Sequence, residues 1–171
     1  EIGLPYESIE VGGAFGGTQT QEYRQMNPNG LVPVIEDHGL PVWESNAIVR
    51  YLSARYALGT LYPQDPALRA QSDKWMDWTI SSFAVAFRDL FWGVVRTAPA
   101  DRDAARIDAA LVRCGELLAL ADAELARQPW LSGDRFAMGD IPLGAFAYAW
   151  FEMPVQRPEL PHLGGWYARL K

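Results

Sequence analysis

The sequence predicts a small α/β domain followed by an all-helical bundle. Up to residue 58 the expected elements are short and are separated by glycine and proline, whereas long periodic segments with few breakers follow from residue 66 to residue 171. Residues 59–65 are expected to form the linker. With 171 residues, 49% of them apolar, the chain is large enough for two small domains that each have a core.

The first expected element is a strand over residues 6–11, where apolar and polar side chains alternate as in a half-buried strand. The stretch VGGAFGGT then predicts a flexible loop before a short helix over residues 21–26. Its glycine spacing matches neither GxGxxG nor the lysine-containing phosphate loop, which favours a loop without nucleotide chemistry.

A β-hairpin and a helix complete this domain. Residues 32–36 and 40–43 are strand-like runs, and the DHG sequence between them is typical of a hairpin turn. Ser45 can cap the following helix, which is expected to continue to about residue 56. Its apolar face at four-residue spacing comprises Ile48, Leu52 and Tyr56.

The helical domain is predicted from two long amphipathic segments that should pack together. Asp65 and Pro66 supply the N-cap and first-turn residue of the first helix, and residues 99–102 break it. Apolar residues alternate at spacings of four and three. The first stripe is Met76, Ile80, Phe83, Phe87, Leu90 and Val94, and the second is Ile107, Leu111, Cys114, Leu118, Ala121 and Leu125. A helix from about 137 or 139 to 150 and another over 163–170 complete the bundle.

Composition excludes several classes of partner. The formal net charge is −6 and lysine and arginine form no long run, so a nucleic-acid-binding surface is not expected. A membrane span is not expected either, because no stretch approaches 18 uninterrupted apolar residues. The single cysteine, Cys114, lies on the apolar stripe and predicts a buried thiol, and a lone cysteine fits the reducing cytoplasm.

The segment NPNGLVPVIEDHGLPVWESNAIVRYL, residues 27–52, carries the functional signals. If the Val32–Pro33 bond is cis, the backbone N–H and C=O of Val32 can pair with an extended peptide as an added strand. The alternative is a trans proline that opens an edge strand. The helix start at Ser45 suits a ligand carboxylate and Glu44 suits an ammonium group, whereas the alternative for this pair is a helix cap with an acidic neighbour.

The order of these features resembles the glutathione-site segment of cytosolic glutathione transferases. The likeness extends over nearly the whole chain: YALGTLYPQDP resembles the interdomain linker of that family, KWMDW the start of its first long C-terminal helix, and LSGDRFAMGDIPLGAF its buried helix-start motif. KWMDW and FWGVVRT favour bacterial theta-like members. The resemblance implies a thioredoxin-like N-terminal domain and an all-helical C-terminal domain.

The resemblance also implies roles for individual residues. Pro33 would be the cis-proline, Val32 would bind the cysteinyl part of glutathione through its backbone, and Glu44 and Ser45 would hold the γ-glutamyl end. The glutathione thiolate would then attack an electrophilic, mostly apolar molecule, as in detoxification. No metal is implied, and the protein would be a homodimer. The apolar wall for the second substrate would include Phe83, Phe87 and Trp92, each of which is also readable as plain core.

Three departures from the family pattern affect these expectations. Leu31 stands where many members place Lys, Arg or Gln, and His38 or Arg24 could substitute for that donor. Ala137 replaces the Ser or Thr of a capping box that ends at Asp140. The Tyr, Ser or Cys that activates glutathione precedes the strand that residues 6–11 resemble. The catalytic residue is therefore unassigned, the first strand and helix are expected to be missing, and a longer parent protein is expected.

Two other functions remain open at this point. The first is a non-catalytic binding or assembly module, because the fold hosts such proteins and a fold alone does not assign a function. The second is a glutathione-dependent isomerase or dehalogenase, whose electrophile site is also built from variable apolar residues.

Overall fold

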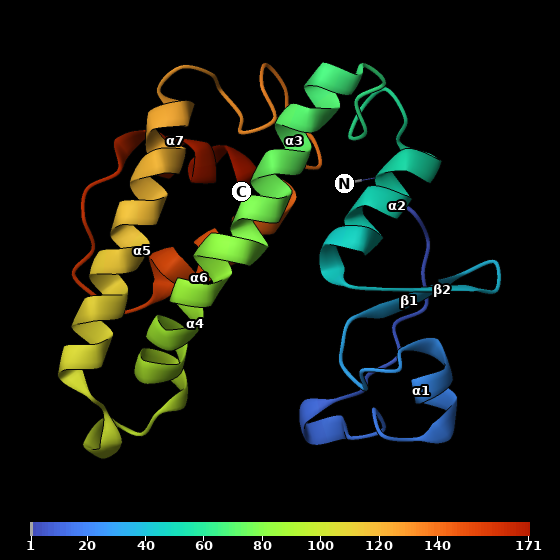
Figure 1. The fold of residues 1–171 in the computed structure, drawn as a ribbon, viewed down its shortest axis with the longest axis horizontal. Helices are drawn as coiled ribbons and strands as arrows, with labels where there is room; N and C mark the ends of the chain where they lie inside the picture. Colours follow the sequence, from blue (N-terminus) through green and yellow to red (C-terminus); the bar gives the residue numbers. More distant parts are fainter. Residues whose placement is uncertain (1) are drawn as a thin grey trace. The chain divides into compact units, whose positions relative to one another are not determined.

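A computed structural model describes residues 2–171, which form two compact units that meet in sequence between Tyr62 and Pro63. The first unit contains a short 3₁₀ turn Gly13–Phe15 and four regular elements (Figure 1). These elements are α1 (Gln21–Met26), β1 (Val34–Asp37), β2 (Leu40–Trp43) and α2 (Ser45–Tyr56). The helix predicted over residues 21–26 is confirmed, and the Thr20 side chain caps it by accepting a hydrogen bond from the Tyr23 N–H at 3.2 Å.

The hairpin predicted around the DHG sequence is confirmed. β1 and β2 are antiparallel, with Val34 opposite Trp43 and Asp37 opposite Leu40. His38 and Gly39, at φ 53° and 82°, form the two-residue turn, and positive φ at both positions is the type I′ arrangement that matches strand twist. β1 begins two residues later than predicted because Pro33 has no N–H to donate to a ladder.

The strand predicted over residues 6–11 is wrong. This segment has no regular secondary structure, and the side chains of Tyr6 and Ile9 are 87% and 74% exposed. Within residues 2–171, β1 and β2 pair only with each other, so no neighbouring strand supplies hydrogen bonds to this segment. Alternation predicts which faces a strand would present, but a strand forms only where a partner strand exists.

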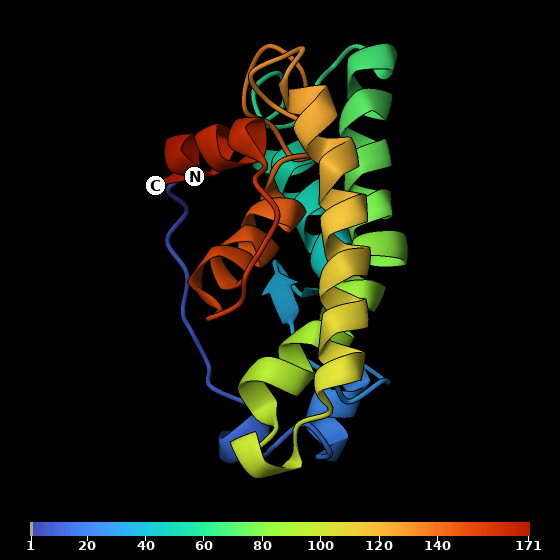
Figure 2. The same cartoon turned by 90° about the vertical axis from the view of Figure 1, so that its left-hand side faces the viewer.

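The second unit is helical throughout its regular structure (Figure 2). The predicted first long helix is a continuous helical run that contains one π-helical turn, Thr79–Phe83, and ends in a second, Trp92–Arg96. The other elements of this unit are α3 (Pro66–Trp78), α4 (Ala84–Phe91), a 3₁₀ turn Pro99–Asp101, α5 (Ala104–Leu125), α6 (Ile141–Glu152) and α7 (Pro161–Leu170). The predicted Asp65 cap is confirmed, because its carboxylate accepts hydrogen bonds from the N–H groups of Ala67 and Leu68, both at 2.9 Å.

The π-helical turn at residues 79–83 changes which residue faces the core at one position of the predicted apolar stripe. Ile80 is 42% exposed, whereas Thr79 is fully buried and its hydroxyl donates to the Trp75 carbonyl at 2.7 Å. A π turn contains an extra residue, so it rotates the inward-facing register relative to a regular α-helix. The remaining members of that stripe, from Phe83 to Val94, lie in the core as predicted.

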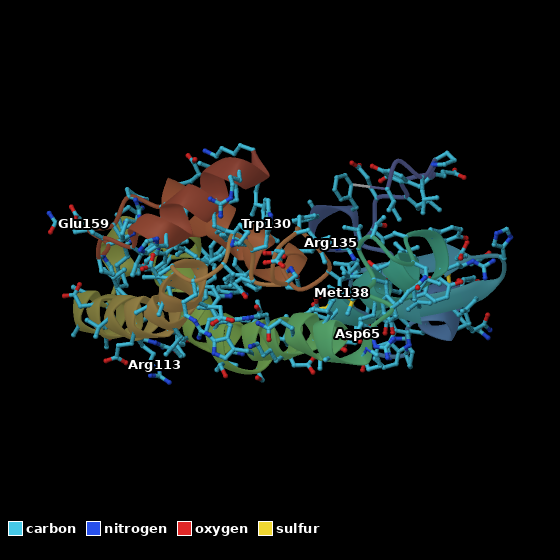
Figure 3. All side chains as sticks on the ribbon, turned by 90° about the horizontal axis from the view of Figure 1, so that it is seen from above. Asp65, Arg113, Trp130, Arg135, Met138 and Glu159 are labelled. Atoms are coloured by element: carbon cyan, nitrogen blue, oxygen red, sulfur yellow. The ribbon has the colours of Figure 1, made fainter. Side chains whose placement is uncertain are left out.

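α4 packs against α5, and the core continues over α6 and α7. Cys114 is fully buried in this core, as predicted, and burial raises the pKa of its thiol to about 12. On the outer face of α5, Arg113 projects outward (Figure 3) and pairs with Glu116 at 3.0 Å. Among residues 2–171, no helix combines the length and the apolar character that crossing a bilayer requires.

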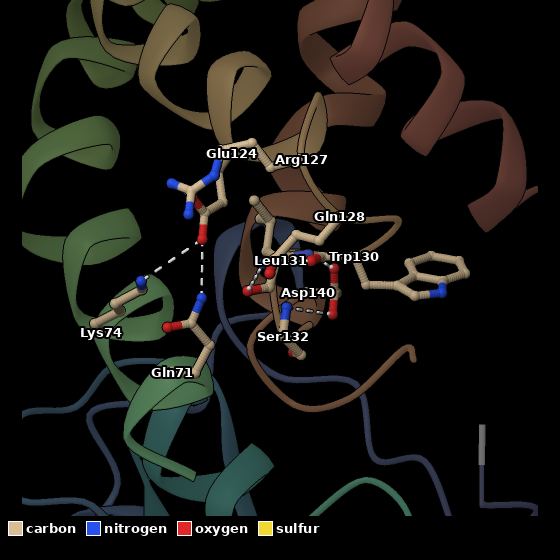
Figure 4. A network of polar contacts seen from close by, with 9 residues as sticks. All are labelled: Gln71, Lys74, Glu124, Arg127, Gln128, Trp130, Leu131, Ser132 and Asp140. Atoms are coloured by element: carbon tan, nitrogen blue, oxygen red, sulfur yellow. Dashed lines mark hydrogen bonds and ion pairs between the residues drawn. The ribbon is translucent and has the colours of Figure 1, made fainter. Parts of the chain in front are cut away.

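A buried carboxylate organises the start of α6 (Figure 4). Asp140 accepts hydrogen bonds from the backbone N–H groups of Leu131 at 2.8 Å, Ser132 at 3.3 Å and Ala137 at 3.3 Å, and from the Trp166 indole at 2.9 Å. Burial raises the pKa of Asp140, and these donors oppose the shift. α6 begins at Ile141, later than predicted, because residues 138–140 form a turn that the carboxylate holds.

Replacing Ala137 by serine is expected to raise the free energy of unfolding by about 0.5–2 kcal/mol. The Ala137 N–H already donates to Asp140, so only the hydroxyl half of the capping box is absent. Chemical denaturation measures the effect. Ala147→Ser is the control, because it buries a hydroxyl within α6 where no cap is available, and it should destabilise. An Ala137→Ser variant that is as stable as the wild type, or less stable, would contradict the expectation.

Candidate functional site

The two predicted parts of the site lie at the same end of the hairpin. Val34 pairs with Trp43, so Pro33 and Glu44 are the next residues outward from that pair, at the end opposite the turn. Paired residues of an antiparallel ladder lie about 5 Å apart, and an extended tripeptide spans about 10 Å. The backbone of Val32 and the start of α2 are therefore close enough for one small peptide to contact both.

The Val32–Pro33 peptide bond is cis, as the first of the two sequence alternatives predicted. The Val32 side chain is 54% exposed, and no backbone hydrogen bond found within residues 2–171 uses its N–H or C=O. Both groups therefore remain available to an extended ligand. The preceding carbonyl, that of Leu31, is in contrast fully engaged, because the Tyr23 hydroxyl and the Asn27 amide both donate to it at 2.7 Å.

An apolar cavity of about 290 Å³ lies beside this turn. It is lined by Ile9, Glu10, Val11, Phe15, Tyr23, Val32, Pro33 and Val34. The cavity ends short of Glu44 and Ser45, so the start of α2 is an open surface. A ligand at this site would have its peptide part beside an apolar wall and its charged end near solvent.

The backbone at Glu44 has an unusual conformation. Its φ of 69° and ψ of 118° lie in a region that side-chain-bearing residues rarely adopt, and such strain persists where the surrounding structure imposes it, often at binding sites. Glu44 occupies the N-cap position of α2, and its carbonyl accepts from the Ile48 N–H at 2.9 Å. This backbone conformation turns the chain sharply from β2 into α2.

Ser45 is the first helical residue and is exposed. The expectation that it caps the helix is wrong, because the residue before it holds the N-cap position and no side-chain cap bond forms there. Its hydroxyl and the backbone of the first turn lie at the end of α2 where the helix dipole favours an anion. Beside them, the exposed Glu44 carboxylate offers an acceptor for an ammonium group. The anion site and this carboxylate together match the two charges of an amino-acid head group.

A second carboxylate braces the turn end of the hairpin. Asp37 accepts hydrogen bonds from the Tyr51 hydroxyl at 2.6 Å and the Tyr56 hydroxyl at 2.8 Å, and pairs with Arg55 at 3.1 Å. The Tyr51 hydrogen bond is the largest cause that lowers the pKa of Asp37. This bracing explains why Tyr56, predicted on the apolar face of α2, is instead directed at a carboxylate on the surface.

His38 and Arg24, the two residues predicted to substitute for a cation at position 31, differ in where they lie. His38 lies in the turn, four residues after Val34, and because a strand rises about 3.3 Å per residue, it is roughly 13 Å from the open end of the hairpin. Arg24 lies closer to Leu31. Its guanidinium donates to Gln19 and, at 3.5 Å, to the carbonyl of Pro28, which is three residues before Leu31 in the chain. Leu31 itself is 64% exposed. Arg24 is therefore the better placed of the two.

The three aromatic residues predicted for the second substrate differ in their surroundings. Phe83 and Phe87 are buried, with ring centroids 5.4 Å apart, and both pack on Phe146. Trp92 is 59% exposed and borders a cavity of about 460 Å³. Its lining includes the charged residues Arg88, Asp89, Asp101, Asp103 and Arg106. Of the three rings, only that of Trp92 is open to a ligand without repacking of the core.

Sequence reasoning missed Tyr23 and Asn27 as contributors to this site. Asn27 carries a recognisable signal, because it follows α1 directly and begins the NPNG turn. Tyr23 carries none beyond its position in a short helix. Within residues 2–171, no three His, Cys, Asp or Glu side chains gather closely enough to hold a metal ion.

Comparisons with known proteins place these features in context. Residues 1–54 match the family model "Glutathione S-transferase, N-terminal domain", and residues 73–171 match "Glutathione S-transferase, C-terminal domain". The chain is 46% identical to the glutathione S-transferase GstB of Escherichia coli strain K12, over 99% of this chain and 83% of that protein.

Solved structures are similar as well. The theta class glutathione S-transferase of the citrus canker pathogen Xanthomonas axonopodis pv. citri, solved with glutathione bound, is 70% identical with a TM-score of 0.95, over 99% of this chain and 81% of that one. Its apo form matches with a TM-score of 0.86 and 63% identity, over 99% and 80%.

Proposed function

The chain belongs to the glutathione S-transferase family, and from this premise we propose that it is an enzyme that conjugates glutathione to electrophilic small molecules. The observation that carries the proposal is the open end of the hairpin, where the free backbone groups of Val32 lie beside the start of α2. A relative that is 70% identical was solved with glutathione bound, which supports the same ligand here.

In the proposed complex, glutathione lies extended along Val32. The Val32 N–H and C=O pair with the cysteinyl residue, and Pro33 holds the turn that presents them. The γ-glutamyl carboxylate accepts from the Ser45 hydroxyl and the N–H groups of the first turn of α2, and Glu44 accepts from the ammonium group. Leu31 offers no charge to the glycine carboxylate, and Arg24 is proposed to supply it.

The proposed reaction is attack of the glutathione thiolate on an electrophilic carbon of an apolar molecule, with loss of a leaving group or addition to a double bond. A cysteine thiol has a pKa of about 8.5, so a hydrogen-bond donor that stabilises the thiolate increases the reactive fraction at neutral pH. We assign no residue of this chain to that role. Trp92 is proposed as the apolar contact for the electrophile, and Phe83 and Phe87 stay predictions.

The assembly and the cellular role are part of the same proposal. The membership of the glutathione S-transferase family supports a homodimer, and exposed apolar side chains of the helical unit, among them Val85, Val112 and Leu120, are candidate contacts. The lone buried Cys114 fits a reducing cytoplasm, where detoxification of electrophiles takes place. Light scattering of the purified protein tests the dimer, because a monomer mass at micromolar concentration would contradict it.

A binding module without catalysis is the second candidate, and the apolar Leu31 in place of a cation favours it. Calorimetric titration with glutathione, followed by mass spectrometry of glutathione incubated with an activated aryl halide, separates the candidates. Binding together with an enzyme-dependent conjugate supports the transferase. Binding without conjugate supports the module, and absence of binding at millimolar glutathione overturns the proposed site.

A further inference from the structure

The Leu31 carbonyl is held by two buried side chains. The Tyr23 hydroxyl and the Asn27 amide nitrogen each donate to this oxygen at 2.7 Å, and the two side chains are 5% and 3% exposed. A carbonyl oxygen has two lone pairs, so these two donors use its full capacity. The oxygen is therefore directed firmly toward the inside of the unit, although the Leu31 side chain is mostly exposed.

The two donors are themselves fixed. Asn27 accepts through its side-chain oxygen from the N–H and the side-chain amide of Asn29, both at 3.1 Å, and its own N–H donates to the Tyr23 carbonyl at 2.9 Å. The Gly30 N–H donates to the Asn27 carbonyl at 2.9 Å. The loop from Asn27 to Leu31 is thus tied to the end of α1 by a closed set of hydrogen bonds.

The orientation of the Val32 N–H follows from this arrangement. The Leu31–Val32 peptide bond is trans, since the only cis bond among residues 2–171 is the next one. The C=O and N–H of a planar trans peptide point in opposite directions. When Tyr23 and Asn27 hold the Leu31 carbonyl inward, the Val32 N–H of the same peptide plane must point outward.

We propose that Tyr23 and Asn27 are positioning residues for glutathione, which act by locking the Leu31–Val32 peptide plane with the Val32 N–H directed at the ligand. This inference rests on the proposed function and deepens it. Neither side chain needs to touch glutathione. Their contribution is preorganisation: a peptide plane that is already oriented has no ordering cost left when the ligand binds.

The test compares Tyr23→Phe, Asn27→Ala and the double variant with Tyr51→Phe in the intact protein. Tyr51→Phe is the matched control, because it also removes one tyrosine hydroxyl from the same unit. That hydroxyl donates a partly buried hydrogen bond of 2.6 Å to Asp37, at the turn end of the hairpin. Calorimetry gives the glutathione affinity, thermal denaturation gives the stability, and steady-state kinetics separates KM from kcat.

Tyr23→Phe is expected to weaken glutathione binding by about three- to tenfold, the effect of one hydrogen bond. KM for glutathione should rise by the same factor with kcat unchanged, because the interaction is equal in the bound ground state and the transition state. The double variant should lose more than the product of the single losses, since either donor alone can still hold the oxygen. Tyr51→Phe should lower the melting temperature without changing the affinity.

The outcomes distinguish this inference from the proposed function. A folded double variant that binds glutathione as tightly as the wild type overturns the positioning role and leaves the function intact. A loss of affinity in Tyr51→Phe as large as that in Tyr23→Phe also overturns it, because destabilisation alone would then explain both. If the wild-type protein does not bind glutathione, the proposed function and the positioning role fail together.

Discussion

Replacing Ser45 by alanine is expected to weaken glutathione binding by roughly 10- to 150-fold, the usual cost of a hydrogen bond to a charged group. The structure makes this loss specific to the ligand, because the Ser45 hydroxyl caps nothing and lies exposed at the first position of α2. Stability should therefore change little, since alanine is an excellent helix former. Calorimetric titration and chemical denaturation of the same samples measure both quantities.

Two further variants sharpen this experiment. Ser45→Thr keeps the hydroxyl and should retain most of the affinity. Ser53→Ala, on the same helix but buried and away from its start, should alter stability and leave the affinity unchanged. Equal affinity in wild type and Ser45→Ala would remove Ser45 from the site and would question the placement of the γ-glutamyl end at α2.

Replacing Glu44 by glycine is expected to stabilise the protein while it weakens glutathione binding. A non-glycine residue at φ 69° and ψ 118° carries about 1–3 kcal/mol of backbone strain, which glycine would relieve at a smaller cost in unfolded-state entropy. A net gain of about 1 kcal/mol is expected in chemical denaturation. The same substitution removes the carboxylate proposed to accept from the ammonium group, so the affinity should fall about tenfold or more.

Glu44→Gln separates the two effects, because it removes the charge and keeps a side chain at the strained position. It should bind glutathione more weakly and show no gain in stability. If Glu44→Gly is instead less stable than the wild type, the strain at this residue has been overestimated. Unchanged affinity in both variants would exclude the carboxylate from ligand binding.

The sequence predicted those elements whose signals are local. The hairpin turn was predictable because positive φ at two adjacent positions favours residues such as those in DHG, and the Asp65 cap because Asp-Pro is a characteristic helix start. The cis bond at Val32 was left open by local sequence, and only the order of the motifs along the chain favoured it. The pairing of Val34 with Trp43 then brought the two halves of the site together.

The features that sequence reasoning missed depend on contacts between distant residues. Alternation over residues 6–11 could not reveal the lack of a strand to pair with. Heptad-like spacing could not show that a π turn would exchange Ile80 for Thr79, because the insertion changes register without changing composition. The strain at Glu44 gave no signal, since glycine or asparagine normally marks such a conformation. Tyr23 became relevant only when its hydroxyl met a carbonyl eight residues away.

The buried thiol of Cys114 makes this chain well suited to site-specific labelling. It is the only cysteine in the 171 residues, it is fully buried, and its pKa of about 12 keeps it protonated at neutral pH. A maleimide or iodoacetamide dye offered to the folded protein should therefore attach only where a new cysteine is introduced. A cysteine at the exposed position 31 would carry a fluorophore beside the site without removal of the native one. Thiol-consumption assays would likewise report on glutathione alone, free of a background from the protein.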